Sequence, residues 1–194
     1  MTGIVLCGGK SSRMGRDKGL LETTGSNWAK LAFDKLSALN IPVKVSVNKN
    51  QYAEYTKTFP AETLVQDNES LYVKGPLAGV LSCHLSFPGE DLFVLACDMP
   101  LMKVSLMQQL YLLYKEPSLH TAFIFTNDKE PEPLCGIYKS AGLSSIMSLL
   151  QSNRLMKYSM KFSLEHLQVK SVEADADQKK YFNNFNAHAD LNGL

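Results

Sequence analysis

The chain opens with a short apolar segment that ends abruptly at two glycines. Residues 4–7 are apolar, and Gly8 and Gly9 follow them directly. Such a run is too short to cross a membrane and is typical of a buried strand. A glycine has no Cβ, so its backbone can turn sharply and approach a ligand closely, and successive N–H groups in such a turn form a concave anion site. This stretch therefore predicts a strand that leads into a phosphate-binding turn.

Two basic residues after this turn add positive charge beside the predicted anion site. They are Arg13 and Lys18, a planar guanidinium and a flexible ammonium. The stretch is not a P-loop, because it lacks the G-x-x-x-x-G-K-[ST] spacing, and glycines at positions 8, 9 and 15 do not fit G-x-G-x-x-G. We expect it to hold a nucleoside triphosphate at the mouth of a sheet. The alternative is a polar turn that only connects a strand to a helix.

Composition limits the other classes of function. A length of 194 residues suits one α/β domain spanning residues 1–194 and is short for two. The net charge of +1 does not suggest a nucleic-acid partner, so we interpret the basic residues of the first loop as local phosphate binders. No apolar run reaches transmembrane length and no signal peptide is recognisable, so we expect a cytoplasmic protein without a membrane partner.

Four cysteines, at positions 7, 83, 97 and 135, form no C-x-x-C pair and have no histidine cluster near them. This spacing fits neither a zinc site nor a disulfide framework, so we expect reduced, buried thiols. Cys7 and Cys97 each end a predicted strand, directly before Gly8 and Asp98. If the sheet follows the doubly wound order, their strands are neighbours, and two small side chains lie beneath the ligand.

The second informative stretch is the apolar run over residues 92–97, which Asp98 and Pro100 follow. A continuous apolar run indicates a central strand that is covered on both faces. Ligands bind outside the carboxyl ends of the strands in open α/β sheets, so Asp98 and Gly8 are expected to face the same crevice. The alternative role of Asp98 is to cap the helix predicted over residues 103–115.

The remaining segments alternate between helical and strand patterns. Helices are predicted over residues 28–39 (with Ser26 as the N-cap), 51–59, 76–85, 103–115, around 146–150 and over 155–166, where Met156, Met160 and Leu164 are expected to face inward. Strands are predicted over residues 43–47, 63–65, 122–125, 134–138 and 169–172. The acidic, proline-rich residues 127–133 are expected to form an exposed loop. This alternation is typical of an α/β protein.

Two positions each keep two interpretations. Asn48 follows the strand over residues 43–47, where its side chain could reach a ligand or cap the next helix. Gly79 lies inside a predicted helix, where glycine costs about 1 kcal/mol relative to alanine. A close contact with another backbone or with a ligand would explain its presence.

The first loop also resembles a known signature. Residues 6–18 read LCGGKSSRMGRDK, which is similar to the L-A-G-G-x-S-x-R-M-G-x-D-K motif of the molybdenum cofactor guanylyltransferases. Further stretches resemble the same family in the same order: Asp67 with residues 74–79 (D…G-P-L-A-G), residues 97–100 (C-D-x-P) and residues 182–186 (F-x-N-x-N). The chain departs from the family at Cys7, where alanine is usual, at residues 25–28, where G-x-P-L is usual, and at Ala187-His188, where Thr-Pro is usual.

The resemblance implies a three-layer, doubly wound, mostly parallel sheet with helices on both faces, the Rossmann-like nucleotidyltransferase fold. It implies transfer of GMP from GTP to the phosphate of molybdopterin, with release of pyrophosphate and with transient contact to molybdoenzymes or their chaperones. The implied nucleotide contacts are Leu6, Cys7, Gly8, Gly9, Lys18, Asn48, Asp67, Gly79 and Asp98. The implied catalytic residues are Arg13, Lys18 and Asp98, with Asp98 also the Mg²⁺ ligand, and the implied acceptor contacts are Asn184 and Asn186.

The chemistry of these residues agrees with that activity. An acceptor phosphate is already anionic near neutral pH, so no general base is required, and the sequence has no evident Ser-His-Asp or Cys-His set. Catalysis would rest on holding two anions together and neutralising charge, with Mg²⁺ on one or two carboxylates and on phosphate oxygens. The alternatives are a cytidylyltransferase for the same pterin, a sugar-1-phosphate nucleotidyltransferase, and a non-catalytic nucleotide- or cofactor-binding carrier. Gly9 favours the guanylyl branch, because cytidylyl relatives usually carry alanine at the first of the paired glycine positions.

Overall fold

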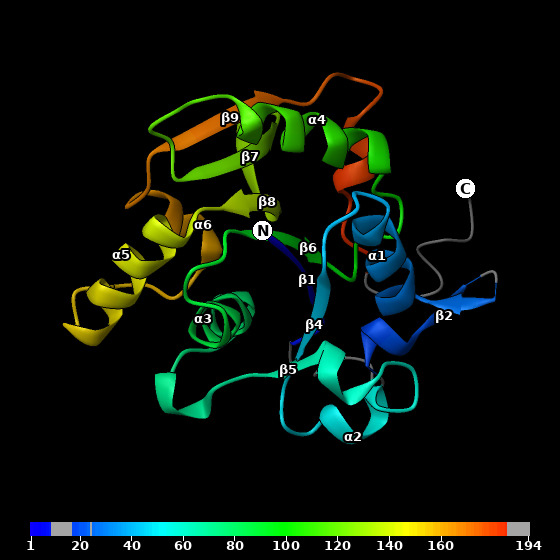
Figure 1. The fold of residues 1–194 in the computed structure, drawn as a ribbon. Helices are drawn as coiled ribbons and strands as arrows, with labels where there is room; N and C mark the ends of the chain where they lie inside the picture. Colours follow the sequence, from blue (N-terminus) through cyan, green and yellow to red (C-terminus); the bar gives the residue numbers. More distant parts are fainter. Residues whose placement is uncertain (9–16, 24, 186–194) are drawn as a thin grey trace.

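The computed structural model describes residues 1–8, 17–23 and 25–185, and a seven-stranded sheet forms its centre (Figure 1). The sheet contains β1 (Thr2–Leu6), β4 (Val43–Val47), β5 (Leu64–Gln66), β6 (Leu92–Ala96), β7 (Ala122–Asn127), β8 (Glu130–Tyr138) and β9 (Val169–Glu173), in the order β5-β4-β1-β6-β8-β7-β9. The neighbours β5, β4, β1 and β6 are parallel, and so are β7 and β9. Only β8, of these seven, runs antiparallel to its neighbours. The sheet is therefore mostly parallel, as predicted.

Helices cover both faces of this sheet. They are α1 (Trp28–Ser37), α2 (Tyr52–Tyr55), α3 (Pro76–Ser86), α4 (Val104–Lys115), α5 (Ser140–Gln151) and α6 (Met160–Leu164). α1, α2 and α4 share a core with Val5 of β1, and α3, α5 and α6 share the opposite core with Ile4. Successive side chains of a strand point to opposite faces, so Ile4 and Val5 belong to different cores. The three-layer α/β architecture is confirmed.

Shorter elements connect these layers. A separate hairpin pairs β2 (Glu22–Thr23) with β3 (Ser26–Asn27) just before α1. Short 3-10 turns lie at Lys18–Leu20, Ala61–Thr63, Glu69–Leu71 and Lys179–Phe182. No helix in the described ranges is long and apolar enough to cross a membrane.

The prediction of an exposed loop over residues 127–133 was wrong. β7 and β8 form a tight hairpin, and its turn residues Asp128 and Lys129 both have positive φ angles, of 52° and 67°, as two-residue hairpin turns require. The register of β8 with β6 covers residues 135–138, so the proline-containing half of β8 pairs with β7 and extends beyond β6. A proline has no N–H to donate and is tolerated where one flank of a strand is open.

Three details of the predicted helices were also wrong. Asn27, not Ser26, caps α1, because its side chain accepts a hydrogen bond from the Lys30 N–H at 2.8 Å. The helix predicted over residues 155–166 is only the short α6, and Met156 is 80% exposed. That methionine precedes the helix, so the helical spacing that placed it inside does not apply. The helix predicted over 51–59 is likewise reduced to α2, after which the chain continues in turns.

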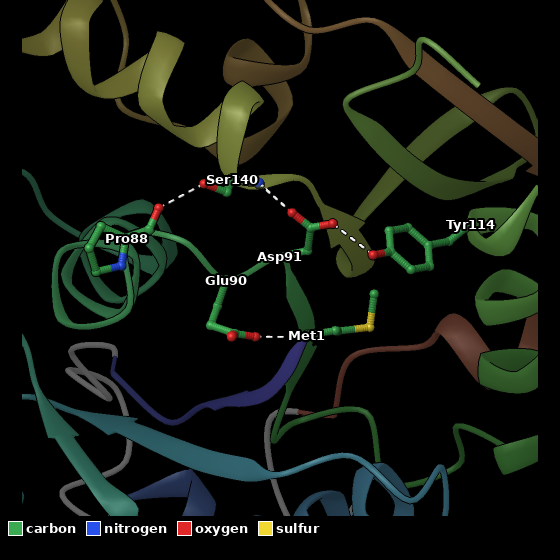
Figure 2. A network of polar contacts seen from close by, with 6 residues as sticks. All are labelled: Met1, Pro88, Glu90, Asp91, Tyr114 and Ser140. Atoms are coloured by element: carbon green, nitrogen blue, oxygen red, sulfur yellow. Dashed lines mark hydrogen bonds and ion pairs between the residues drawn. The ribbon is translucent and has the colours of Figure 1, made fainter. Parts of the chain in front are cut away.

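A network of polar contacts holds the amino ends of the central strands (Figure 2). Asp91, just before β6, accepts hydrogen bonds from the Ser140 N–H at 2.8 Å and from the Tyr114 hydroxyl at 2.7 Å. The Ser140 hydroxyl donates to the Pro88 carbonyl at 2.7 Å, and the Met1 amine pairs with Glu90 at 2.6 Å. Asp91 therefore joins β6 to α4 and α5 at the end of the sheet opposite to the predicted site.

At the carboxyl ends of the parallel strands, the backbone pairing continues past the strands themselves. The Cys7 N–H donates to the Ser46 carbonyl at 3.0 Å, and the Cys97 N–H donates to the Leu6 carbonyl at 3.1 Å. The predicted adjacency of the strands that carry Cys7 and Cys97 is thus confirmed, and both thiols are free and buried. The chain consequently leaves the sheet at neighbouring points, just before Gly8 and Asp98.

Candidate functional site

Two adjoining hollows lie at the carboxyl ends of β1, β4, β5 and β6. The first, of about 190 Å³, is lined by Leu6, Cys7, Gly8, Asp17, Lys18, Pro76, Ala96, Cys97, Asp98 and Leu134. The second, of about 800 Å³, is lined by Gly8, Asn48, Lys49, Asn50, Asp67, Asn68, Glu69, Tyr72, Val73, Lys74, Gly75 and Ala78. Gly8 belongs to both, so the two hollows form one crevice, at the place where open α/β sheets bind ligands. We call them the small and the large hollow.

Lys18 and Asp98 face each other in the small hollow. The Lys18 ammonium lies 3.5 Å from Asp98 Oδ2, and the two side chains are 28% and 23% exposed. Burial raises the pKa of the Asp98 carboxyl, and the Lys18 charge opposes this rise. The alternative role of Asp98 as a helix cap is not realised, because Lys103 precedes α4 and its N-terminus has no side-chain cap. Asp98 thus presents its carboxylate to the crevice beside a fixed positive charge.

The turn that carries Asp98 is held from two directions. The Phe185 N–H donates to the Asp98 carbonyl at 2.9 Å, and the Phe185 ring packs with Leu21 and Trp28. From α1, the Lys35 ammonium donates to the Pro100 carbonyl, and burial lowers the pKa of Lys35 to about 8. The backbone on both sides of the Asp98 carboxylate is therefore anchored.

Asp67 occupies the wall of the large hollow, next to two glycines. The Ser46 hydroxyl donates to Asp67 Oδ1 at 2.9 Å. A Cβ on Gly8 would lie 2.9 Å from Asp67 Oδ2, and a Cβ on Gly79 would lie 2.5 Å from Ser46 Oγ and 3.0 Å from Leu6 Cδ2. The close approach expected at Gly79 is therefore made to side chains. Burial raises the pKa of Asp67, and the Ser46 hydroxyl lowers it by less.

Asn48 caps the turn before α2, although α2 itself begins without a side-chain cap. Its side-chain oxygen accepts hydrogen bonds from the N–H groups of Asn50 at 2.9 Å and Gln51 at 3.2 Å. This is a local cap of the turn that leads into α2. The residue also lines the large hollow. Asn48 therefore shapes the rim beside Asp67 while it caps the turn.

The structure brings together most of the residues that the sequence singled out. Leu6, Cys7, Gly8, Lys18, Asn48, Asp67 and Asp98 line the crevice, and Gly79 lies directly beneath it. Asn184 is exposed and precedes Phe185, whose backbone contacts Asp98. Gly9, Arg13 and Asn186 lie outside the described residues.

The sequence analysis did not identify several residues of the crevice. Ser46 reads as an ordinary outward position of a strand, yet it is fully buried beneath Asp67. Tyr72 is 89% exposed at the rim of the large hollow and has a positive φ of 53°. Leu134 comes from β8, which the sequence does not place beside the first loop. A proline-rich hairpin strand carried no signal that would have identified this contact.

The site fits a Mg²⁺ ion that is held chiefly by its ligand. Within the described ranges, no group of three His, Cys, Asp or Glu side chains could hold a metal on its own. Mg²⁺ at nucleotide sites usually takes one or two carboxylates, phosphate oxygens and water. Asp98 supplies one carboxylate, and it lines the small hollow together with Gly8. Such a donor set suits a nucleotide-bound metal better than a permanent protein cage.

Comparisons with known proteins relate this chain to proteins of molybdenum cofactor biosynthesis. The model of the MobA-like NTP transferase domain family matches residues 3–168. A molybdenum cofactor guanylyltransferase of Campylobacter jejuni is 29% identical over 93% of this chain and 88% of its own length. A molybdenum cofactor biosynthesis bifunctional protein of Synechocystis is 31% identical over 73% of this chain, but the match spans only 40% of that relative.

A solved structure agrees at the level of the fold. The crystal structure of molybdopterin-guanine dinucleotide biosynthesis protein A from Archaeoglobus fulgidus superimposes with a TM-score of 0.79. The superposition covers 99% of this chain and 95% of that one, with 22% sequence identity. The fold described above is therefore shared with that protein.

Proposed function

Because this chain belongs to the MobA-like NTP transferase family, we propose that it transfers GMP from GTP to the phosphate of molybdopterin. An oxygen of the acceptor phosphate forms a bond to the α-phosphorus of GTP. The bond from that phosphorus to the bridging oxygen of the β-phosphate breaks, and pyrophosphate leaves. The observation that carries this proposal is the approach of Lys18 to Asp98, 3.5 Å apart, in the hollow that Gly8 lines.

The residues of the small hollow act by position and charge. We assign the backbone of Leu6, Cys7 and Gly8 to contact with the nucleotide, and Lys18 to neutralising the negative charge that builds up on the phosphates. The acceptor phosphate is itself anionic, so the chain needs to supply no general base. The main contribution to the rate comes from holding the acceptor phosphate in line with the α-phosphorus of GTP. A site of this kind accelerates the reaction by keeping the two reactants in a fixed geometry.

The large hollow is the proposed place of the nucleoside. Its volume of about 800 Å³ is ample for a base and a ribose. Asp67 and Asn48 stand on its wall, and we assign them to ribose hydroxyls or to the edge of the base. A polar group that pairs with guanine rejects a base lacking the matching donor or acceptor. Gly79 lets α3 lie close to β4, since a side chain there would collide with Ser46.

We propose that the acceptor binds on the side of the crevice where Asn184 and Phe185 approach Asp98. Asn184 directly precedes Phe185, whose N–H is bound to the Asp98 carbonyl. An amide at this position is close enough to the Asp98 turn to contact an acceptor phosphate or pterin there. Arg13, Gly9 and Asn186 complete the proposal on the basis of the family motif, with Arg13 assigned to the departing pyrophosphate.

Mg²⁺ is the proposed metal, and Asp98 is the residue that would hold it. When bound, it would supply Lewis-acid stabilisation of charge on the phosphates. We further propose that the product passes to molybdoenzymes or their chaperones through transient contacts. The four buried, free thiols support a location in the reducing cytoplasm.

The proposal is tested by measuring pyrophosphate release with each of the four nucleoside triphosphates, in the presence of Mg²⁺ and molybdopterin. We expect release with GTP that depends on molybdopterin, and a guanine dinucleotide as the second product by mass spectrometry. Preference for CTP would identify a cytidylyltransferase. Release that depends on a sugar 1-phosphate would identify a sugar nucleotidyltransferase. GTP binding without pyrophosphate release would identify a carrier.

A further inference from the structure

Asp17, which directly precedes Lys18, is held by three hydrogen-bond donors. Its Oδ1 accepts from the Gly19 N–H at 2.9 Å and from the Tyr55 hydroxyl at 3.0 Å. Its Oδ2 accepts from the side-chain amide of Gln51. A carboxylate with three donors on two oxygens has little freedom to rotate. The backbone that leads into Lys18 is consequently fixed at a defined point.

Gln51 connects Asp17 to the carboxyl ends of two strands. Its Nε2 donates to the Cys7 carbonyl at 2.9 Å as well as to Asp17, and its Oε1 accepts from the Asn48 N–H at 2.9 Å. Cys7 directly follows β1, and Asn48 directly follows β4. One side-chain amide therefore spans both strand ends and the start of the Lys18 turn.

Tyr55 of α2 contacts Asp17 from the buried side. The side chain is fully buried, and its ring stacks on Phe59 with centroids 6.3 Å apart. The hydroxyl is so close to Gly19 that a Cβ there would lie 2.1 Å from it. Burial raises the pKa of Tyr55 far above its ordinary value, and the nearby Cys7 thiol adds to this rise. The phenol therefore stays protonated and remains a donor to Asp17.

From these contacts we infer that Gln51 and Tyr55 are positioning residues that act through Asp17 to hold Lys18 opposite Asp98. This inference rests on the proposed function of the crevice, because it assigns these side chains to the geometry of that site. A lysine side chain loses considerable conformational freedom when it is held in one place. Fixing the residue before it reduces that cost, since the Cα of Lys18 can no longer move away from the hollow.

The structure offers a matched control at the other end of the sheet. The Tyr114 hydroxyl donates to Asp91 at 2.7 Å (Figure 2). The Tyr55 hydroxyl donates to Asp17 at 3.0 Å in the same way, and burial raises the pKa of both phenols. Tyr114→Phe and Tyr55→Phe thus delete the same kind of tyrosine–aspartate hydrogen bond. Only the second deletion touches the turn that carries Lys18.

The first experiment compares the GTP-dependent release of pyrophosphate by these two variants. We expect Tyr55→Phe to lower kcat/KM by about 10-fold, the size of one hydrogen bond to a charged group. Tyr114→Phe should leave this parameter unchanged. Gln51→Met, which keeps the length of the side chain and removes its amide, provides a second variant in case Tyr55→Phe folds poorly. Equal kinetics in Tyr55→Phe, Gln51→Met and Tyr114→Phe would overturn the inference.

A double-variant measurement separates positioning of Lys18 from a general structural role. If Tyr55 acts through Lys18, Tyr55→Phe should lower the rate in the natural chain and have no further effect in a Lys18→Ala background. The same proportional loss in both backgrounds would mean that Tyr55 supports the site by another route, and would contradict the inference.

A third readout does not depend on the reaction. Lysine amines can be reductively methylated with ¹³C, and the Lys18 signal can be identified by its loss in Lys18→Arg. We expect Tyr55→Phe to shift the Lys18 signal and Tyr114→Phe to leave it in place. If the natural chain released no pyrophosphate, the proposed function would fail while this comparison still decided the inference. An unmoved Lys18 signal in Tyr55→Phe would refute the positioning role.

Discussion

The Lys18 ammonium and the Asp98 carboxylate lie 3.5 Å apart although 80 positions separate them in the sequence. Lys18 begins the 3-10 turn at Lys18–Leu20, and Asp98 follows β6, the strand paired with β1. Parallel neighbours end at the same edge of the sheet, so the pair forms as a consequence of strand order. Both side chains are partly exposed to solvent, and such pairs contribute little to stability. We therefore interpret the pair as a feature of the site and not as a stabilising ion pair.

The charged residues of the first loop should have unequal effects. Lys18→Ala should lower the rate of transfer by about 10²-fold or more, because a preorganised charge at the phosphates is lost. Arg13→Ala should have a comparable effect, whereas Arg16, at a variable position of the family motif, should tolerate alanine. Rates of pyrophosphate release by the three single variants provide the measurement. Equal damage from all three would indicate a diffuse basic patch.

Gly79 should not tolerate a methyl group. The Cβ of Gly79→Ala would lie 2.5 Å from Ser46 Oγ and 3.0 Å from Leu6 Cδ2, and overpacking of this kind typically costs about 1–3 kcal/mol. We expect a lower midpoint of urea unfolding together with weaker GTP binding, because Ser46 also holds Asp67. In a Ser46→Ala background, which removes the obstructing hydroxyl, the stability cost of Gly79→Ala should shrink. An unchanged cost would show that Ser46 is not the obstacle.

Asp67 makes the stability of the nucleotide-free protein depend on pH. Burial raises its pKa in the folded chain above the ordinary 3.8. This carboxyl group makes its full contribution to the free energy of unfolding at a pH below its pKa in the unfolded chain. That contribution is lost as the pH rises through its higher pKa in the folded chain. Asp67→Asn cannot ionise and can still accept from Ser46, so it should raise the melting temperature at about pH 8.

The pH profile supplies the control for this prediction. The difference in melting temperature between Asp67→Asn and the natural chain should disappear at about pH 3, where the natural carboxyl is protonated in both states. Nucleotide affinity should nevertheless fall in the variant, since the proposed contact loses its charge. A variant that is less stable than the natural chain at pH 8 would contradict this account of Asp67.

Cys7 should matter for its size and not for its thiol. The residue is buried, and the neighbouring Cys7 thiol, together with burial, raises the pKa of Cys97. Cys7→Ala should retain nearly normal transfer, whereas Cys7→Leu should weaken GTP binding more than stability, because it pushes the Gly8 turn into the hollow. Binding titrations and melting curves of both variants distinguish the two effects. Lost transfer with intact GTP binding in Cys7→Ala would assign the thiol a chemical role.

Sequence patterns were sufficient for the part of the site that lies on strand ends. Gly8, Asp67 and Asp98 each lie just after a predicted strand, and parallel strands bring such positions to one edge of the sheet. Alternating helical and strand patterns were sufficient to predict the α/β class, and the resemblance to a known signature implied the three-layer arrangement. The resemblance to a known signature added the expected roles of these residues.

The contacts that depend on packing between distant segments were not predictable. Asp17, Gln51 and Tyr55 meet through turns whose paths the sequence does not encode in any periodic pattern. The strand predicted over residues 134–138 is the second half of β8. The first half was missed because Pro131 and Pro133 ordinarily mark loops, and only the sheet order places them beyond the end of β6. Met156 was misplaced because α6 begins four residues later, at Met160.

The most direct test of the whole account compares pyrophosphate release by the natural chain and by Asp98→Asn, with saturating GTP, Mg²⁺ and molybdopterin. The amide keeps the shape of the side chain and removes the charge that would hold the metal. Because burial raises the pKa of Asp98, the variant should melt no lower than the natural chain near neutral pH. We predict that release by Asp98→Asn is about 10²- to 10³-fold slower, as expected for the loss of one preorganised charge contact. Equal rates in the two proteins at saturating Mg²⁺ would contradict the assignment of the crevice between Gly8 and Asp98 as the site of GMP transfer.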